Sequence, residues 1–158
     1  MRTSTQSEET NLARSGATVE KLLAQKGGLI FSVHPKDSIE KTVDILREKR
    51  IGAVVVLSDS GELAGILSER DIVRKLADSP SGLLDITVDM LMSKNVKVCS
   101  PKDTLISVLA TMTEGRFRHM PVMSNQKLLG IVTIGDVVHF RIKELEHEAV
   151  QLKQMIVG

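Results

Sequence analysis

The sequence predicts a mixed α/β (α+β) fold made of two β-α-β-β-α repeats related by a pseudo-twofold axis. The segment GELAGILSERDIV at residues 61–73 reappears as QKLLGIVTIGDVV at residues 126–138, which aligns Gly65 with Gly130 at a shift of 65. Upstream, HPKDSI matches SPKDTL at a shift of 66. Within each copy, short apolar runs typical of buried strands alternate with apolar residues at helical spacing. Two copies with one polar pair each indicate two related clefts.

Length and composition fit this prediction. A chain of 158 residues, 42% of them hydrophobic, can form one ordinary domain or two closely packed half-domains with a real core. Aromatic residues make up 2%, with no Trp or Tyr, which argues against ring platforms for nucleic-acid bases or sugars. The net charge of +1 gives no global field that would recruit a polyanion.

The single cysteine, Cys99, rules out an intrachain disulfide and a cysteine-based zinc site. The chain has no apolar run of 18 residues, and residues 1–26 lack the apolar core of a signal peptide. These features favour a cytoplasmic protein with no membrane contact.

The elements of the first copy follow in order. Residues 1–16 are polar and predicted to be disordered. A helix over residues 17–26 stops at the Gly27-Gly28 pair, and a short extended piece ends at Pro35. Asp37 and Ser38 are cap candidates for the next helix, after which IGAVVVL and ELAGIL are strands and RDIVRKLA is a helix.

The second copy repeats this order from Val96. The predicted boundaries are residues 17–79 for the first repeat with its lead-in helix, 80–95 for a linker with a short lead-in of its own, 96–140 for the second repeat and 141–158 for an extension of the last helix. Along that helix, apolar residues recur every three or four positions at Val138, Ile142, Leu145, Ala149, Leu152 and Ile156. This stripe either covers the core of its own domain or contacts a second copy.

Two polar pairs stand where a strand gives way to a helix. They are Ser68 with Asp71, and Thr133 with Asp136. A hydroxyl cap with an acid at the third helical position closes a helix start. A carboxylate in this place could also accept hydrogen bonds from the vicinal hydroxyls of a ribose, while the helix N–H groups hold a phosphate. Both interpretations can apply to the same pair.

These segments carry a resemblance to a known family. The residues are VHPKDSIEKTVDILREKRIGAVVVL with GELAGILSERDIVRKLA, and VCSPKDTLISVLATMTEGRFRHMPVM with KLLGIVTIGDVV. The chain resembles a tandem pair of cystathionine β-synthase (CBS) domains, a Bateman module of the stand-alone bacterial type, over about residues 18–140. The resemblance implies repeats packed through their sheets and clefts that bind AMP, ADP, ATP, NAD(H) or S-adenosylmethionine.

The resemblance also implies which residues bind the nucleotide. Ser68, Asp71, Thr133 and Asp136 would hold the ribose. The adenine pocket would be lined by Gly52, Ala53 and Val54 in one copy and by His119, Met120 and Pro121 in the other. Residues near the first strand of each repeat, Ile30 and Ser93 to Val96, would complete the walls.

The two copies differ beside these pockets. The second copy offers Arg116, Arg118 and His119, whereas the first places Arg70 before its aspartate and lacks the proline of His119-Met120-Pro121. Cations facing a pocket would bind phosphate, although a surface charge explains Arg116 equally well. The sequence therefore predicts two non-equivalent sites.

The function that these features favour is a non-catalytic regulatory module, an energy or redox sensor that acts on a protein partner in trans and forms a homodimer. No metal-ligand spacing, Gly-rich phosphate loop or nucleophile elbow occurs in the sequence, so a nucleotide-hydrolysing enzyme is the weaker alternative. A nucleic-acid-binding protein is the other alternative, and the near-neutral charge speaks against it.

Overall fold

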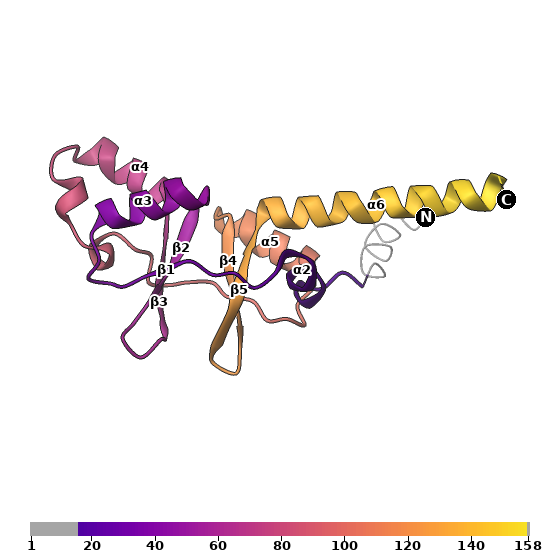
Figure 1. The fold of residues 1–158 in the computed structure, drawn as a ribbon, viewed down its shortest axis with the longest axis horizontal. Coiled ribbons are helices and arrows are strands. Elements are labelled where there is room, and N and C mark those ends of the chain that lie inside the picture. The colour runs from indigo at the N-terminus through magenta and orange to yellow at the C-terminus, as the bar shows by residue number, and fades with distance from the viewer. Residues whose placement is uncertain (1–15, 158) are drawn as a thin grey trace, which may run out of the picture. The chain divides into compact units, whose positions relative to one another are not determined.

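The computed structural model describes residues 16–157, in which helices and strands follow the order that the repeats predict (Figure 1). The predicted disorder of residues 1–16 falls, apart from Gly16, outside the described residues. Contacts divide the chain into two compact units. Of the described residues, one unit contains Leu29–Val98 and Met123–Gly130, and the other contains residues 16–28, Cys99–Val122 and residues 131–157. We call them the first-repeat unit and the second-repeat unit.

The first-repeat unit is built on a three-stranded sheet of order β1-β2-β3. Its elements are β1 (Ser32–Val33), α3 (Ile39–Lys49), β2 (Ala53–Leu57), β3 (Leu63–Ser68) and α4 (Glu69–Asp78). Strand β1 runs parallel to β2, and β2 runs antiparallel to β3. This is the predicted β-α-β-β-α sequence of elements.

Helix α3 covers the core of this unit. Ser38 accepts a hydrogen bond from the Lys41 N–H and is the N-cap, so the cap prediction is confirmed. The helix buries Ile39 and Leu46 in a core that contains Val54 and Leu67 from the strands. Since each fully buried aliphatic side chain contributes about 1.5–3 kcal/mol, this packing fixes the sheet against the helix.

The second-repeat unit contains α2 (Val19–Lys26), α5 (Leu105–Gly115) and α6 (Ile134–Val157). It also contains the start of β4 (His119–Ser124) and the end of β5 (Lys127–Thr133), which pair in a two-stranded sheet. Its core is formed by residues from all of these elements: Val19, Leu22, Leu105, Val108, Met112, Met120, Val122, Val132, Val137 and Phe140. The mixed α+β class is confirmed in both units.

The second repeat differs from the prediction at its start. Where the first repeat has strand β1, the second has a single parallel bridge between Cys99 and Val122. In the first repeat the Val55 N–H donates to the Phe31 carbonyl at 3.3 Å, and this bond helps to hold β1. The equivalent of Val55 is Pro121, which has no N–H to donate. Pro121 therefore explains why the predicted strand is reduced to one bridge.

Each repeat is completed by the lead-in segment of the other. The Val19 N–H donates to the Asp103 carbonyl at 2.9 Å, and the Val88 N–H donates to the Asp37 carbonyl at 2.8 Å. Val19 and Val88 are both fully buried. Helix α2 thus packs on the second repeat, although it directly precedes the first in the sequence, and residues 86–93 pack on the first repeat.

Burial makes the Cys99 thiol unreactive. The side chain is 4% exposed, and desolvation, followed by the charge of Asp103, raises the pKa of the thiol to about 11. Because the thiolate is the nucleophile, we expect iodoacetamide to label the folded chain very slowly at neutral pH. In denaturant, labelling should become as fast as that of a cysteine in a peptide, as followed by mass spectrometry. Rapid labelling of the folded chain would contradict this burial.

Candidate functional site

In the first repeat, Ser68 and Asp71 form a reciprocal cap where β3 ends and α4 begins. The Asp71 N–H donates to Ser68 Oγ at 3.3 Å, and the Ser68 N–H donates to Asp71 Oδ2 at 3.0 Å. The Ser68 hydroxyl also donates to Asp71 Oδ2 at 2.9 Å. The capping interpretation of this pair is confirmed.

In the second repeat, Thr133 and Asp136 form the same cap where β5 meets α6. The Asp136 N–H donates to Thr133 Oγ1 at 3.0 Å, and the Thr133 N–H donates to Asp136 Oδ2 at 2.9 Å. Here a cation joins the pair, because Lys26 Nζ lies 2.5 Å from Asp136 Oδ2 and 2.8 Å from the Ile131 carbonyl oxygen. Lys26 is the last residue of α2, so sequence proximity gave no sign of this ion pair.

The Asp71 and Asp136 carboxylates use the same oxygen, Oδ2, for capping. The hydrogen bonds to Asp71 and Asp136 given above all reach Oδ2, and none of them reaches Oδ1. A carboxylate has about four lone-pair positions, so Oδ1 retains acceptor capacity. Asp136 is 25% exposed and Asp71 is half-buried, which leaves both within reach of a solute. Each aspartate can therefore cap its helix and still accept a hydrogen bond from a ligand at Oδ1.

The strands predicted to line the adenine pockets, which begin at Ala53 and at His119, lie next to these caps. We call them the pocket strands. Ala53 pairs with Ser68 across β2 and β3, and the Glu69 N–H donates to the Gly52 carbonyl at 2.9 Å. In the second repeat the Ile134 N–H donates to the Arg118 carbonyl at 3.0 Å. Each repeat thus brings its pocket strand and its aspartate to one junction.

These matching hydrogen bonds establish how the two pocket strands align. Gly52 corresponds to Arg118, at a shift of 66, so Ala53 corresponds to His119 and Val55 to Pro121. The missing proline of the first repeat is therefore at Val55.

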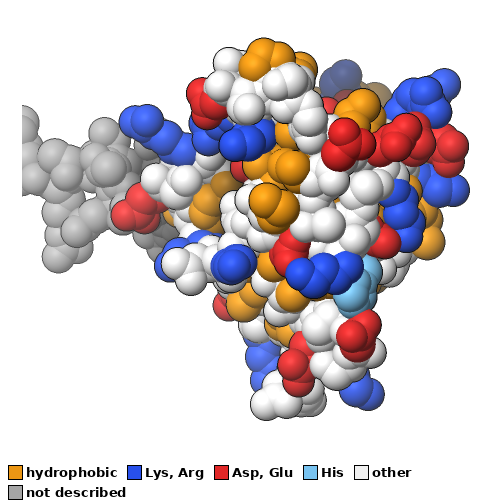
Figure 2. Space-filling model, turned by 90° about the vertical axis from the view of Figure 1, so that its left-hand side faces the viewer, with side chains coloured by type: hydrophobic (Ala, Val, Ile, Leu, Met, Phe, Trp, Pro, Cys, Tyr) orange, Lys and Arg blue, Asp and Glu red, His pale blue; other side chains and the backbone are white. Residues whose placement is uncertain are grey.

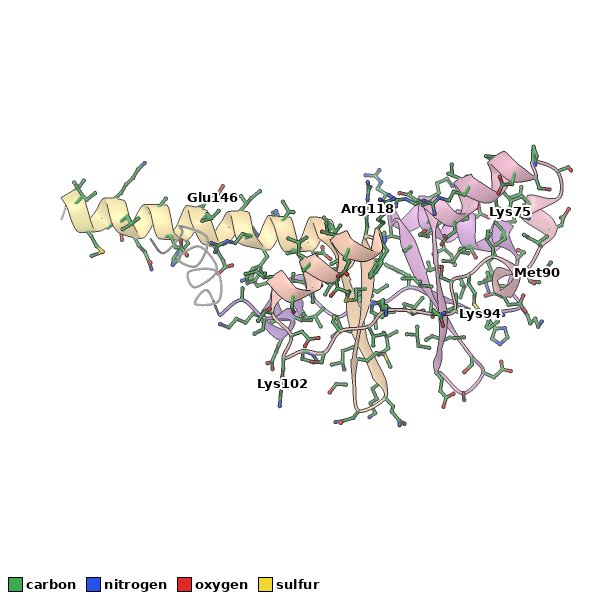
Figure 3. The ribbon with its side chains drawn as sticks, turned by 180° about the vertical axis from the view of Figure 1, so that it is seen from behind. Lys75, Met90, Lys94, Lys102, Arg118 and Glu146 are labelled. Carbon is green, nitrogen blue, oxygen red and sulfur yellow. The ribbon has the colours of Figure 1, made fainter. Side chains whose placement is uncertain are left out.

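The candidate cations occupy different places. Arg116 is the left-handed C-cap of α5 at φ 57, and Arg50 has the same place after α3 at φ 53, so the two copies match there. The difference lies at Arg118, which is exposed just before β4 (Figure 3), where the first repeat has Gly52. Arg70 and His119 are half-buried.

The remaining predicted wall residues lie in the first-repeat unit. Ser93 is hydrogen-bonded to Ile66 of β3 in both directions, at 2.9 and 3.1 Å, and therefore borders the first repeat. Ile30 and Val96 are half-buried. In the second repeat, the Ile131 carbonyl, which aligns with Ile66, is bonded by Lys26 instead.

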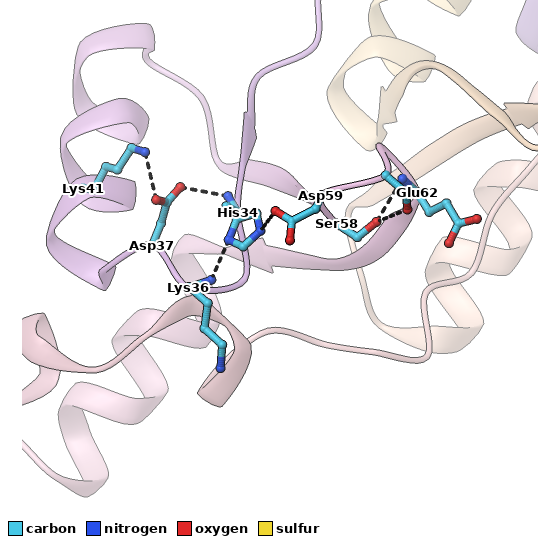
Figure 4. A network of polar contacts seen from close by, with 8 residues as sticks. His34, Lys36, Asp37, Lys41, Ser58, Asp59 and Glu62 are labelled. Carbon is cyan, nitrogen blue, oxygen red and sulfur yellow. Dashed lines mark hydrogen bonds and ion pairs between the residues drawn. The ribbon is translucent and has the colours of Figure 1, made fainter.

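A polar network that the sequence did not predict ties β1 to the turn between β2 and β3 (Figure 4). The Lys36 N–H donates to His34 Nδ1 at 3.1 Å, so the ring proton is on Nε2, which lies 2.6 Å from Asp59 Oδ1.

Burial raises the pKa of Asp37, but the hydrogen bonds from the His34 N–H and from Lys41 outweigh burial and hold that pKa below its usual value. A hydrogen bond from Lys36 lowers the pKa of Asp89.

Charged side chains of both signs are mixed on one face of the molecule. Figure 2 shows basic and acidic side chains intermixed on the face turned to the viewer. Among residues 16–157, no group of three or more His, Cys, Asp or Glu side chains is arranged to hold a metal ion. Within the same range, no helix is both long and apolar enough to cross a bilayer.

Comparison with known proteins agrees with the repeat. The family model described as CBS domain matches residues 30–78 and 86–143. An uncharacterised 33.4 kDa protein of Thermofilum pendens is 31% identical over 84% of this chain, which spans 45% of that relative's length. The crystal structure of a CBS-domain-containing protein of Agrobacterium tumefaciens is 41% identical and covers 81% of this chain and 96% of its own, with a TM-score of 0.78.

A more distant structure shares the fold. It is the CBS domain pair of protein MJ0100, crystallised with methylthioadenosine and S-adenosyl-L-methionine. It has a TM-score of 0.72 at 22% identity and covers 81% of this chain and 98% of its own. The fold and the two junctions thus define a tandem α+β repeat protein with one capped aspartate in each repeat. The chain belongs to the CBS domain family.

Proposed function

We propose that this chain is a non-catalytic regulatory module that binds adenosine nucleotides at the two strand-to-helix junctions. The observation that supports this proposal is how each aspartate uses its two oxygens. Oδ2 accepts the hydrogen bond that caps the helix, and Oδ1 keeps its capacity to accept others. A ribose offers two neighbouring hydroxyl donors to such an oxygen. The adenosine compounds bound by the CBS pair of protein MJ0100 support the same ligand class.

The proposed sites are non-equivalent because their charges differ. Lys26 contacts Asp136 in the second repeat, and Arg118 lies where the first repeat has Gly52. Both cations favour a phosphate-bearing ligand at the second repeat. We propose AMP, ADP, ATP or NAD(H) as the ligands, with the second repeat preferring the more highly charged ones. The bound module would act on a protein partner in trans and assemble as a homodimer.

Ligand identification tests this proposal. The purified chain should release an adenosine nucleotide on denaturation or bind AMP, ATP or NADH in calorimetric titration. A ligand that binds the folded state alone stabilises it by about 2.7 kcal/mol at 100 times its Kd. For a chain of this size we expect a rise in Tm of about 5–10 °C.

The same experiment separates the alternatives. Guanosine nucleotides at matched concentration are the control and should raise Tm much less. If no adenosine compound binds or stabilises the chain, the proposal is wrong. Steady turnover of ATP with magnesium would favour an enzyme, and a strongly salt-dependent RNA complex that AMP does not displace would favour nucleic-acid binding.

A further inference from the structure

Helix α6 presents an apolar stripe that does not reach the core of its own unit. The residues of α6 that are buried there are Val137 and Phe140, at 4% and 8% exposure. The stripe begins one residue after Val137 and therefore lies on a different side of the helix from the buried residues. We call it the α6 seam, and its residues are Val138, Ile142, Leu145, Ala149, Leu152 and Ile156. Its large side chains are 46–84% exposed. The alternative that the stripe covers its own core is therefore wrong.

The spacing of the α6 seam is that of a coiled coil. Successive seam residues are alternately four and three positions apart, which is a strict heptad over the helix. Ile142, Ala149 and Ile156 take the a positions, and Val138, Leu145 and Leu152 take the d positions. Among parallel coils, isoleucine at two of the three a positions with leucine at two of the three d positions favours two strands.

The charges beside the seam match a parallel partner of identical sequence. In a parallel coil, a g residue faces the e residue five positions later on the other helix. This pairs Arg141 with Glu146 of the second copy, and Glu148 with Lys153 of the second copy, and both pairs have opposite charges. Glu146 lies near the middle of α6 (Figure 3).

The opposite orientation is disfavoured by the same residues. An antiparallel pair with the seams fully overlapped faces e with e and g with g. It would set Glu146 against Glu146 of the second copy and Glu148 against Glu148 of the second copy. Like charges at these positions repel. The heptad therefore selects both a second copy of this chain and its direction.

We propose that α6 pairs with α6 of a second copy as a parallel two-stranded coiled coil along the α6 seam. The inference deepens the homodimer of the proposed function and is independent of nucleotide binding. A helix of 24 residues is about 36 Å long, which is enough for three heptads. The seam side chains that are exposed in one chain become the buried interface of two.

Sedimentation of the full chain tests the seam. We expect a dimer, and we expect the double substitution Leu145→Glu with Leu152→Glu to give a monomer in which Cys99 is still labelled slowly. Leu145 and Leu152 are 48% and 60% exposed, and neither belongs to the core cluster. Lys153→Glu should raise the dimer Kd about 5- to 30-fold by turning two attractive pairs into repulsive ones. Adding Glu148→Lys should restore the Kd. Lys143→Glu makes the same charge change off the seam and is the matched control.

Disulfide trapping tests the direction. In a parallel coil, Leu145→Cys and Leu152→Cys should each form a disulfide-linked dimer on mild oxidation. In an antiparallel pair, at most one position can lie on the twofold axis, so efficient linkage at both would be impossible. The unsubstituted chain, whose own Cys99 is buried, is the control.

The outcomes separate the two proposals. A monomer at all concentrations overturns both the homodimer and the seam. If the variant with Leu145→Glu and Leu152→Glu still forms a dimer with the same Kd, the seam is wrong and the homodimer stands. Linkage at only one of the two cysteine positions overturns the parallel direction. Nucleotide titration of the monomeric variant reports on the ligand sites independently of all three.

Discussion

Alanine in place of Asp71 or Asp136 is expected to weaken adenosine-nucleotide binding at its own repeat by about 10- to 100-fold. Hydrogen bonds to a charged acceptor contribute about 1.5–3 kcal/mol, and each substitution removes the oxygen proposed to accept the ribose hydroxyls. Calorimetric titration of each variant should show one site lost and the other retained. The double substitution should abolish both the binding and the ligand-induced rise in Tm.

The control must separate binding from helix capping, because both aspartates also close a helix start. Asp103 is a suitable comparison, since its carboxylate accepts the Ser100 N–H at 2.8 Å at a turn of the second repeat. Asp103→Ala should lower stability by about 1 kcal/mol, as loss of a cap does, and leave nucleotide affinity unchanged. If Asp71→Ala and Asp136→Ala behave like Asp103→Ala, the ribose assignment is wrong and these residues only cap.

Leu22→Ala is expected to destabilise the second-repeat unit by about 2–5 kcal/mol, the cost typical of removing a buried leucine side chain. Leu22 is 2% exposed and belongs to the core cluster that contains Leu105 and Val122. Hydrogen exchange should accelerate in α5 and β5, and the labelling rate of Cys99 should rise with it.

The mirror substitution is Val88→Ala. Val88 is fully buried in the core cluster of the first-repeat unit, although it directly precedes the second repeat in the sequence. Exchange should accelerate in α3 and β2 in this variant. Faster exchange in β2 after Leu22→Ala, with α5 unchanged, is the result that contradicts the assignment of α2 to the second-repeat unit.

Local patterns predicted most of the fold. Apolar spacing located the helices and strands, and the cap chemistry of Ser38 and Ser68 marked where helices begin, because these signals act within a few residues. The sequence left open which pocket strand lies beside which aspartate, and the backbone hydrogen bonds place each aspartate beside the strand of its own repeat. The domain boundaries proposed from the sequence stay a prediction, as do the roles of the site residues.

The differences have non-local causes. Nothing in the sequence around Lys26 indicates Asp136, which is 110 positions later, as its ion-pair partner. The His34–Asp59 contact likewise joins residues 25 positions apart. Pro121 is plain in the sequence, but its effect on the fold is not. The proline shortens the first strand of the second repeat because that strand would have accepted a hydrogen bond from an N–H at position 121. The backbone hydrogen bonds also establish that Val55 of the first repeat stands where the second has Pro121.

The exchanged lead-in segments have a consequence for the order in which the protein can form during synthesis. Helix α2 is made early, yet Leu105, which shares its core, follows Leu22 by 83 residues. The first-repeat unit has nearly all of its parts once residue 98 has emerged from the ribosome. An eight-residue helix is only marginally stable alone, so α2 must wait unfolded until α5 and β5 appear. Helix α2 is thus among the last elements to become structured, although it is among the first to be made.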